Sequence, residues 1–84
     1  MIYNIFFSTK AKKQLKKLDE TPRKEILKKL YSLKGNPLPH LKKLKGSKFW
    51  RLRIEDYRAV LDVIITERKI LVLRVDKRSR VYDR

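Results

Sequence analysis

FWRLRI at residues 49–54 and YRAVLDVII at residues 57–65 are two apolar segments separated by only two residues. In the first segment, apolar side chains alternate with Arg51 and Arg53, which predicts a β-strand with one apolar and one basic face. The second segment is almost continuously apolar, which is typical of a central strand buried on both faces. A short acidic turn joins the two, so the sequence predicts a hairpin, which residues 70–75 extend by a third strand.

Upstream of the hairpin, the sequence predicts a strand and two helices. Residues 2–7 are aromatic and β-branched, as in a strand, and Ser8 can cap the helix that follows. Thr21 can cap a second helix with Pro22 at its first position, where the missing N–H costs nothing, and Gly35 ends it. A short turn joins the helices, which should form an antiparallel hairpin.

The predicted element order is β-α-α-β-β-β. It defines an α+β fold with an antiparallel sheet and the helical hairpin packed on one face. A chain of 84 residues is expected to form a single domain over residues 1–84. No apolar run has the length of a membrane span, and the first residues lack the features of a signal peptide, so a cytoplasmic protein without a membrane partner is expected.

The chain is strongly basic, with 24 Lys and Arg residues against 9 Asp and Glu residues and a net charge of +15. This charge predicts salt-dependent attraction to a polyanion or to an acidic protein. Residues 1–48 hold thirteen lysines and one arginine, whereas residues 49–84 hold two lysines and eight arginines. Lysines act as diffuse point charges and arginines suit fixed geometry. We therefore interpret the first part as an electrostatic landing surface and the second as the specific site.

Guanidinium groups from several segments, together with one phenol, can gather on the open face of the predicted sheet. These residues are Arg51, Arg53, Arg58, Arg78 and Tyr82. Guanidinium groups bind phosphate oxygens in a planar, bidentate way, so the cluster predicts a phosphate site. A simpler interpretation is that Arg51 and Arg53 only solvate the open face, with Glu55 or Asp62 as candidate partners.

The residue types in this chain exclude several kinds of chemistry. There is no cysteine and only one histidine, His40 in a Pro-rich loop, so no zinc site and no other cofactor is expected. A Gly-rich phosphate loop is also absent from the sequence. A cationic cluster with a tyrosine suits the attack of an RNA 2′-hydroxyl on its own adjacent phosphate. In that reaction the substrate supplies the nucleophile, and the protein orients it and stabilises the developing charge.

Four segments of the sequence resemble the RelE toxins of the RelE/ParE superfamily. They are LKG at 44–46, WRLRI at 50–54, DYR at 56–58 and KRSRVY at 77–82, in the same β-α-α-β-β-β order. The resemblance covers essentially the whole chain. It implies the toxin of a type II toxin–antitoxin pair, a ribosome-dependent endonuclease that enters the vacant ribosomal A site and cleaves the mRNA codon there.

The resemblance also implies roles for individual residues. Arg51 and Arg53 match two basic residues of the second strand, Arg58 matches the arginine that opens the third, and Arg78 and Tyr82 match the arginine and tyrosine of the ending. The best-known RelE has lysines in place of Arg51 and Arg53, and an arginine cannot accept a proton. Tyr82 is therefore a candidate base. The expected RNA-binding residues are Lys45, Lys48, Lys77 and Arg80.

The expected partners are the ribosome with its mRNA and a RelB-like antitoxin, an acidic, partly disordered chain that folds around the basic domain. Two alternatives remain open from the sequence. One is a ParE-like inhibitor of DNA gyrase, which shares the fold and has no nuclease chemistry. The other is a basic domain that binds RNA without cleaving it.

Overall fold

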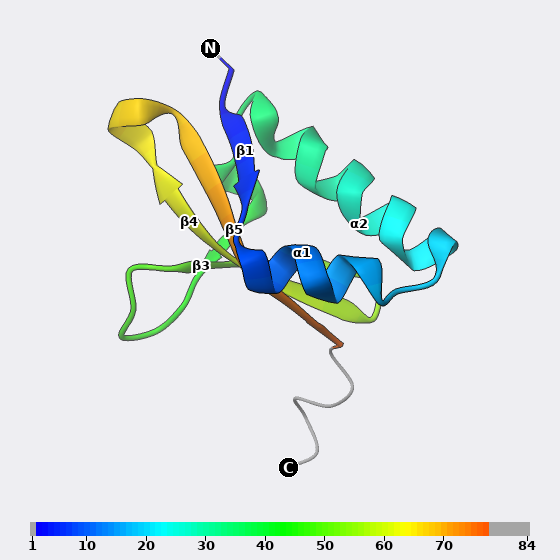
Figure 1. The fold of residues 1–84 in the computed structure, drawn as a ribbon. Helices are drawn as coiled ribbons and strands as arrows, with labels where there is room; N and C mark the ends of the chain where they lie inside the picture. Colours follow the sequence, from blue (N-terminus) through cyan, green and yellow to red (C-terminus); the bar gives the residue numbers. More distant parts are fainter. Residues whose placement is uncertain (1, 78–84) are drawn as a thin grey trace.

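A five-stranded sheet with the strand order β1-β5-β4-β3-β2 organises the molecule in the computed structural model, which describes residues 2–77. The strands are β1 (Asn4–Phe7), β2 (Lys42–Lys43), β3 (Trp50–Ile54), β4 (Tyr57–Ile64) and β5 (Lys69–Lys77). The helices α1 (Thr9–Lys16) and α2 (Glu20–Tyr31) lie on one side of it (Figure 1). The predicted α+β class and the order of the main elements are confirmed.

The sheet is mixed, and this is the main difference from the predicted antiparallel sheet. Strand β1 pairs with β5 in parallel, from Asn4 opposite Lys69 to Phe7 opposite Val72. Parallel pairing requires a long connection, which the helices and the β3–β4 hairpin supply. Strand β2 is a further addition, because its two residues lie in a segment that the sequence predicts to be a loop. The remaining pairs, β2–β3, β3–β4 and β4–β5, are antiparallel.

The helix starts agree with the sequence prediction at α1 and differ from it at α2. Ser8 caps α1, and its hydroxyl accepts a hydrogen bond from the backbone N–H three residues further on at 3.0 Å. The prediction that Thr21 caps α2 is wrong, because α2 begins at Glu20 with Asp19 as the capping residue. Pro22 is therefore the third helical residue. It is still tolerated, since the N–H groups of the first turn have no partner within the helix.

The corner between the two helices is closed by Arg23. Its guanidinium donates to the backbone carbonyl oxygens of Leu18 at 2.8 Å and Leu15 at 3.5 Å. These carbonyls lie at and just beyond the end of α1, where helix geometry leaves acceptors without partners. Arg23, the one arginine among residues 1–48, therefore has a structural role.

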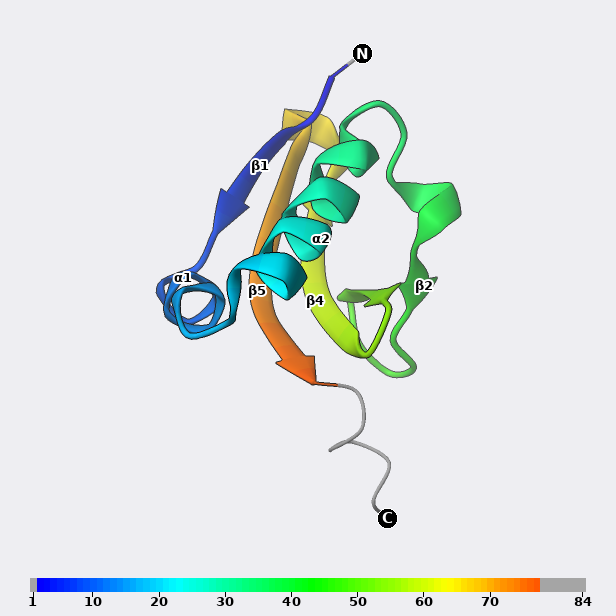
Figure 2. The same cartoon turned by 90° about the vertical axis from the view of Figure 1, so that its right-hand side faces the viewer.

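The hydrophobic core lies between the helices and one face of the sheet. Figure 2 shows α2 in front of β4 and β5. The fully buried large side chains include Ile26, Leu30, Leu33, Leu61, Ile70 and Val72. In β4, the three consecutive residues Ala59–Leu61 are buried, and β4 lies between β5 and β3, which confirms the predicted central position. No helix within residues 2–77 is long and apolar enough to cross a membrane.

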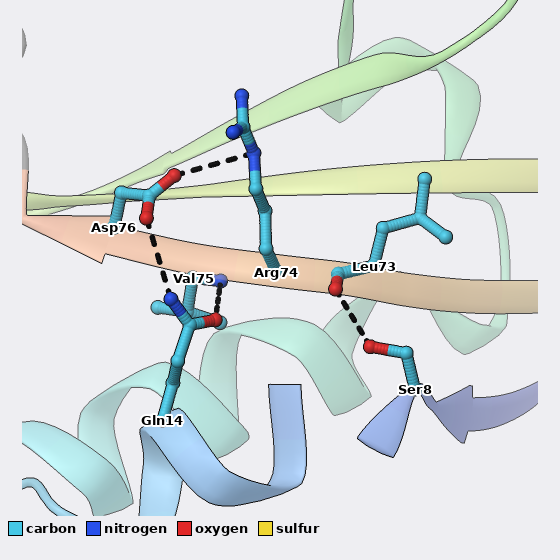
Figure 3. A network of polar contacts seen from close by, with 6 residues as sticks. All are labelled: Ser8, Gln14, Leu73, Arg74, Val75 and Asp76. Carbon is cyan, nitrogen blue, oxygen red and sulfur yellow. Dashed lines mark hydrogen bonds and ion pairs between the residues drawn. The ribbon is translucent and has the colours of Figure 1, made fainter. Parts of the chain in front are cut away.

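Beyond the end of β1, two side chains of the α1 segment occupy the free edge of β5 (Figure 3). The Ser8 hydroxyl donates to the carbonyl oxygen of Leu73 at 2.6 Å, and the side-chain oxygen of Gln14 accepts from the N–H of Val75 at 2.8 Å. The Gln14 amide nitrogen also donates to Asp76 at 3.3 Å. Side chains thus replace the backbone of a neighbouring strand and fix the end of β5, from which the basic ending continues.

The two glycines make a matched pair for a stability test. Gly46 has a φ of 72°, whereas Gly35 has a φ of −75°, and an added Cβ would meet no heavy atom within 4 Å at either position. Gly46→Ala should therefore lower the free energy of unfolding by about 1 kcal/mol through backbone strain alone. Gly35→Ala should raise it by about 0.5 kcal/mol, because it restricts the unfolded chain. Urea denaturation of both variants checks the prediction, and equal effects of the same sign would contradict it.

Candidate functional site

The pairing of β3 with β4 brings three of the predicted site residues together. Arg53 lies directly opposite Arg58 in the antiparallel register, and Arg51 lies two residues before Arg53 on the same face. Leu52 and Ile54, which alternate with these arginines, are buried on the helix side. Burial of these apolar side chains therefore determines which face of β3 carries the guanidinium groups. The two arginine positions of β3 are about 7 Å apart, because two residues of a strand span that distance.

A cavity of about 310 Å³ opens beside these arginines. It is lined by Pro39, His40, Leu41, Lys42, Arg51, Arg53 and Arg58. Its size lies at the lower end of the range of small-molecule sites, about 300–1,000 Å³. Four cations line the cavity, and no carboxylate of residues 2–77 lies among its walls. It is therefore suited to an anionic group such as a phosphate.

The sequence prediction did not include the segment that forms the other wall of this cavity. Residues Leu38–His40 make a single 3₁₀ turn after the buried Pro37, and β2 follows at once. Lys42 of β2 pairs with Arg51, which brings the turn beside the arginines. The only available signal was a histidine in a Pro-rich loop close to the arginine-bearing strand. Two-residue strands have too short a pattern to be found from sequence.

The arginines of the cavity are not held by carboxylates in the described part of the chain. The ion pairs within residues 2–77 join Lys24 to Glu20, Lys69 to Glu67 and Arg74 to Asp76. They do not include a pairing of Arg51 or Arg53 with Glu55 or Asp62, the two candidate partners of the simpler interpretation. The guanidinium groups keep their charge available to a ligand.

Arg58 is the most constrained of the three. Its Nε is buried and has no hydrogen-bond partner among residues 2–77. Asp76 lies opposite Arg58 in β5, but its carboxylate oxygens are 3.3 Å from Gln14 Nε2 and 3.3 Å from Arg74 Nε. Because buried donors without acceptors are rare in native proteins, we expect this N–H to meet an acceptor other than residues 2–77, such as an ordered water, an ion or a ligand.

The remaining predicted residues lie away from the cavity walls or outside the described residues. Lys45 and Lys48 are exposed in the connection between β2 and β3, and Lys77 is exposed at the end of β5. Lys48 Nζ lies 5.6 Å from the ring centre of Phe49. Arg78, Arg80 and Tyr82 fall outside residues 2–77, so their roles stay predictions.

The unpartnered Nε of Arg58 leads to a stability prediction. Arg58→Met keeps much of the apolar volume and removes the buried donor, so it should raise the free energy of unfolding by about 1 kcal/mol. Arg53→Met serves as the control, because it removes the same charge from the opposite residue of β3 but from an exposed side chain. We expect inorganic phosphate to raise the melting temperature of the unsubstituted protein more than that of Arg58→Met.

Thermal and urea denaturation of the three proteins, with and without phosphate, check this prediction. A loss of stability in Arg58→Met larger than that in Arg53→Met would show that Arg58 already has a structural partner. The prediction that the Arg58 guanidinium binds a ligand would then be wrong.

The fold agrees with a known class of small proteins, the toxins of type II toxin–antitoxin systems. A model of the family described as "ParE toxin of type II toxin-antitoxin system, parDE" matches residues 5–82. The RelE1 protein of Methanocaldococcus jannaschii is 30% identical to this chain. The alignment is 87 positions long, gaps included, and covers 98% of this chain and 97% of the relative.

Solved structures give the same result. The isolated RelE toxin of E. coli is 32% identical, with a TM-score of 0.80 over 95% of this chain and 90% of that chain. A chain of the toxin-antitoxin complex RelBE2 from Mycobacterium tuberculosis is 25% identical, with a TM-score of 0.86 over 93% of this chain and 100% of that chain. The chain therefore belongs to the RelE/ParE superfamily of type II toxins, as a RelE-type member.

Proposed function

We propose that this toxin is a ribosome-dependent endonuclease that cleaves mRNA in the ribosomal A site and so inhibits translation. The observation that carries the proposal is the cavity lined by Arg51, Arg53 and Arg58, with no carboxylate among its described walls and with the buried Arg58 Nε lacking a partner. An RNA phosphate supplies the acceptor oxygens that these groups lack. The resemblance to RelE toxins supports the same assignment.

In the proposed reaction, the 2′-hydroxyl oxygen of one nucleotide attacks its own 3′-phosphate. Arg58 and Arg78 hold the scissile phosphate and stabilise the negative charge that grows on its oxygens, which is electrostatic catalysis. Arg51 and Arg53 hold the RNA backbone on either side. Tyr82 stacks on a base, orients the 2′-hydroxyl or takes its proton. No metal or other cofactor has a role in this scheme.

The ribosome supplies the rest of the binding energy in this proposal. The exposed lysines of both helices contact ribosomal RNA, and Lys45, Lys48, Lys77 and Arg80 contact RNA nearer the site. Each phosphate neutralised releases counterions, so the affinity for ribosomes should fall steeply as salt rises. The site of action is the cytoplasm, where translating ribosomes are found.

We further propose an acidic RelB-like antitoxin as the cognate inhibitor. Several similar solved structures are complexes of a RelE toxin with its RelB antitoxin, including one from Pyrococcus horikoshii. A groove of about 470 Å³ lies at the two helices, with Phe7, Leu15 and Leu27 as apolar walls. Its rim carries Lys12, Lys13, Lys16 and Arg23. Apolar walls with a cationic rim complement a segment that carries apolar anchors and carboxylates.

Inhibition of DNA gyrase, the ParE-like alternative, is not favoured, because the matched relative and the similar solved structures at 25% identity or more that are named above are RelE proteins. The two functions differ in a simple observation. A gyrase inhibitor leaves mRNA intact, whereas the proposed endonuclease cuts it within one codon.

The test is primer extension on a defined mRNA with ribosomes stalled at an empty A site. The unsubstituted toxin should cleave within the A-site codon, and only in the presence of ribosomes. Arg58→Ala should lower the cleavage rate by about 10²–10³-fold, the usual effect of removing one group that stabilises transition-state charge. Lys69→Ala is the matched control, because it removes one positive charge from the other end of β5 and Lys69 does not line the cavity.

Three outcomes are informative. Cleavage of free RNA would show a nuclease that does not need ribosomes, and intact mRNA with the folded toxin would overturn the proposed function. Equal losses in Arg58→Ala and Lys69→Ala would show that net charge, and not the cavity, determines the rate.

A further inference from the structure

The proposed reaction must move protons, and the arginines of the cavity cannot move them. The 2′-hydroxyl has to lose a proton before or as it attacks, and a guanidinium stays protonated at any physiological pH. Among the residues that line the cavity, His40 is the one whose side-chain type gains and loses a proton near neutral pH. The proposal that follows rests on the proposed function.

The fold holds His40 at the cavity by backbone contacts on both sides. Its N–H donates to the carbonyl oxygen of Pro37 at 3.0 Å, and the next N–H, that of Leu41, donates to Leu38 at 3.1 Å. Pro37 is buried, and the fixed φ of Pro37 and Pro39 stiffens the turn. Two residues later, Lys42 pairs with Arg51. His40 therefore lies on a short, restrained turn that lines the same cavity as the arginines.

The chemistry of the surroundings suits an imidazole that accepts a proton. The other charged groups of the cavity are Lys42 of β2, Arg51 and Arg53 of β3, and Arg58 of β4. None of them has a lone pair free to accept a proton while it is charged. His40 is exposed, so its ring can reach a bound nucleotide and exchange its proton with water.

We infer that His40 is the general base of the cleavage reaction. An imidazole nitrogen takes the proton of the 2′-hydroxyl while the oxygen forms its bond to phosphorus. The bond from phosphorus to the 5′-oxygen of the next nucleotide breaks, and that oxygen takes a proton from water. The products are a 2′,3′-cyclic phosphate and a 5′-hydroxyl end. The imidazolium then returns its proton to solvent.

This assignment leaves Tyr82 to stack on the base or to orient the 2′-hydroxyl. It also explains how a chain with arginines at both basic positions of β3 can carry out proton transfer. The base is supplied by the turn before β2 and not by the sheet.

The experiment measures single-turnover cleavage at saturating concentrations of stalled ribosomes, as a function of pH. His40→Gln should lower the rate by about 10²–10⁴-fold, the usual contribution of a general base. Its apparent affinity for the ribosome complex should change little, because glutamine keeps the hydrogen-bonding capacity. The rate of the unsubstituted toxin should fall at acidic pH, because a protonated imidazole can no longer act as a base, and this fall should be absent in His40→Gln.

Lys42→Gln is the matched control, because it changes a neighbouring wall residue of the same cavity. It should weaken binding and keep the fall of the rate at low pH. Addition of free imidazole to His40→Ala should restore part of the cleavage rate, which a purely structural role would not allow. Thermal denaturation of each variant confirms that it is folded.

The outcomes separate this inference from the proposed function. If the unsubstituted toxin cleaves and Arg58→Ala does not, while His40→Gln keeps both the full rate and the fall at low pH, then His40 is not the base and the nuclease assignment stands. If Tyr82→Phe instead abolishes the pH dependence, the tyrosine is the base. If the unsubstituted toxin leaves mRNA intact, both proposals are overturned.

Discussion

The antiparallel pairing of β3 with β4 is the constraint on which the rest of the structure depends. Its register places Leu52 opposite Ala59 in the core and Arg53 opposite Arg58 on the other face. A shift of one residue would bury the guanidinium groups and expose the apolar ones, so the hydrophobic core and the cationic site are specified by the same register. The free energy gained by burying the core therefore also fixes the geometry of the site.

The arginine cluster also represents a compromise between stability and binding. Four like charges share one cavity without a carboxylate in its described walls, and one buried donor lacks a partner among residues 2–77. Each of these features lowers the stability of the free protein and favours a bound anion. Asp76 is the nearest carboxylate in the register, and Gln14 and Arg74 hold it through their own contacts. The fold thus keeps an acidic side chain close to the cluster without neutralising it.

Those parts of the fold that follow from patterns among neighbouring residues could be predicted from the sequence. The alternation of apolar and basic residues predicted β3 and the face that carries Arg51 and Arg53. A nearly continuous apolar run predicted that β4 is a central strand. The parallel pairing of β1 with β5 joins residues more than sixty positions apart, and no local pattern encodes it. His40 was missed for the same reason: its place at the cavity comes from a two-residue strand that pairs with β3.

The edge of β5 beyond β1 has a dynamic consequence. A row of free backbone groups on a sheet edge is a template for another chain, and here it is closed by the side chains of Ser8 and Gln14. Breaking these contacts requires the rotation of only two side chains, whereas separating a strand from a sheet breaks a row of backbone hydrogen bonds. The contacts of Ser8 and Gln14 with β5 can therefore break in a local fluctuation. The end of β5 can then be remodelled while the rest of the sheet stays intact.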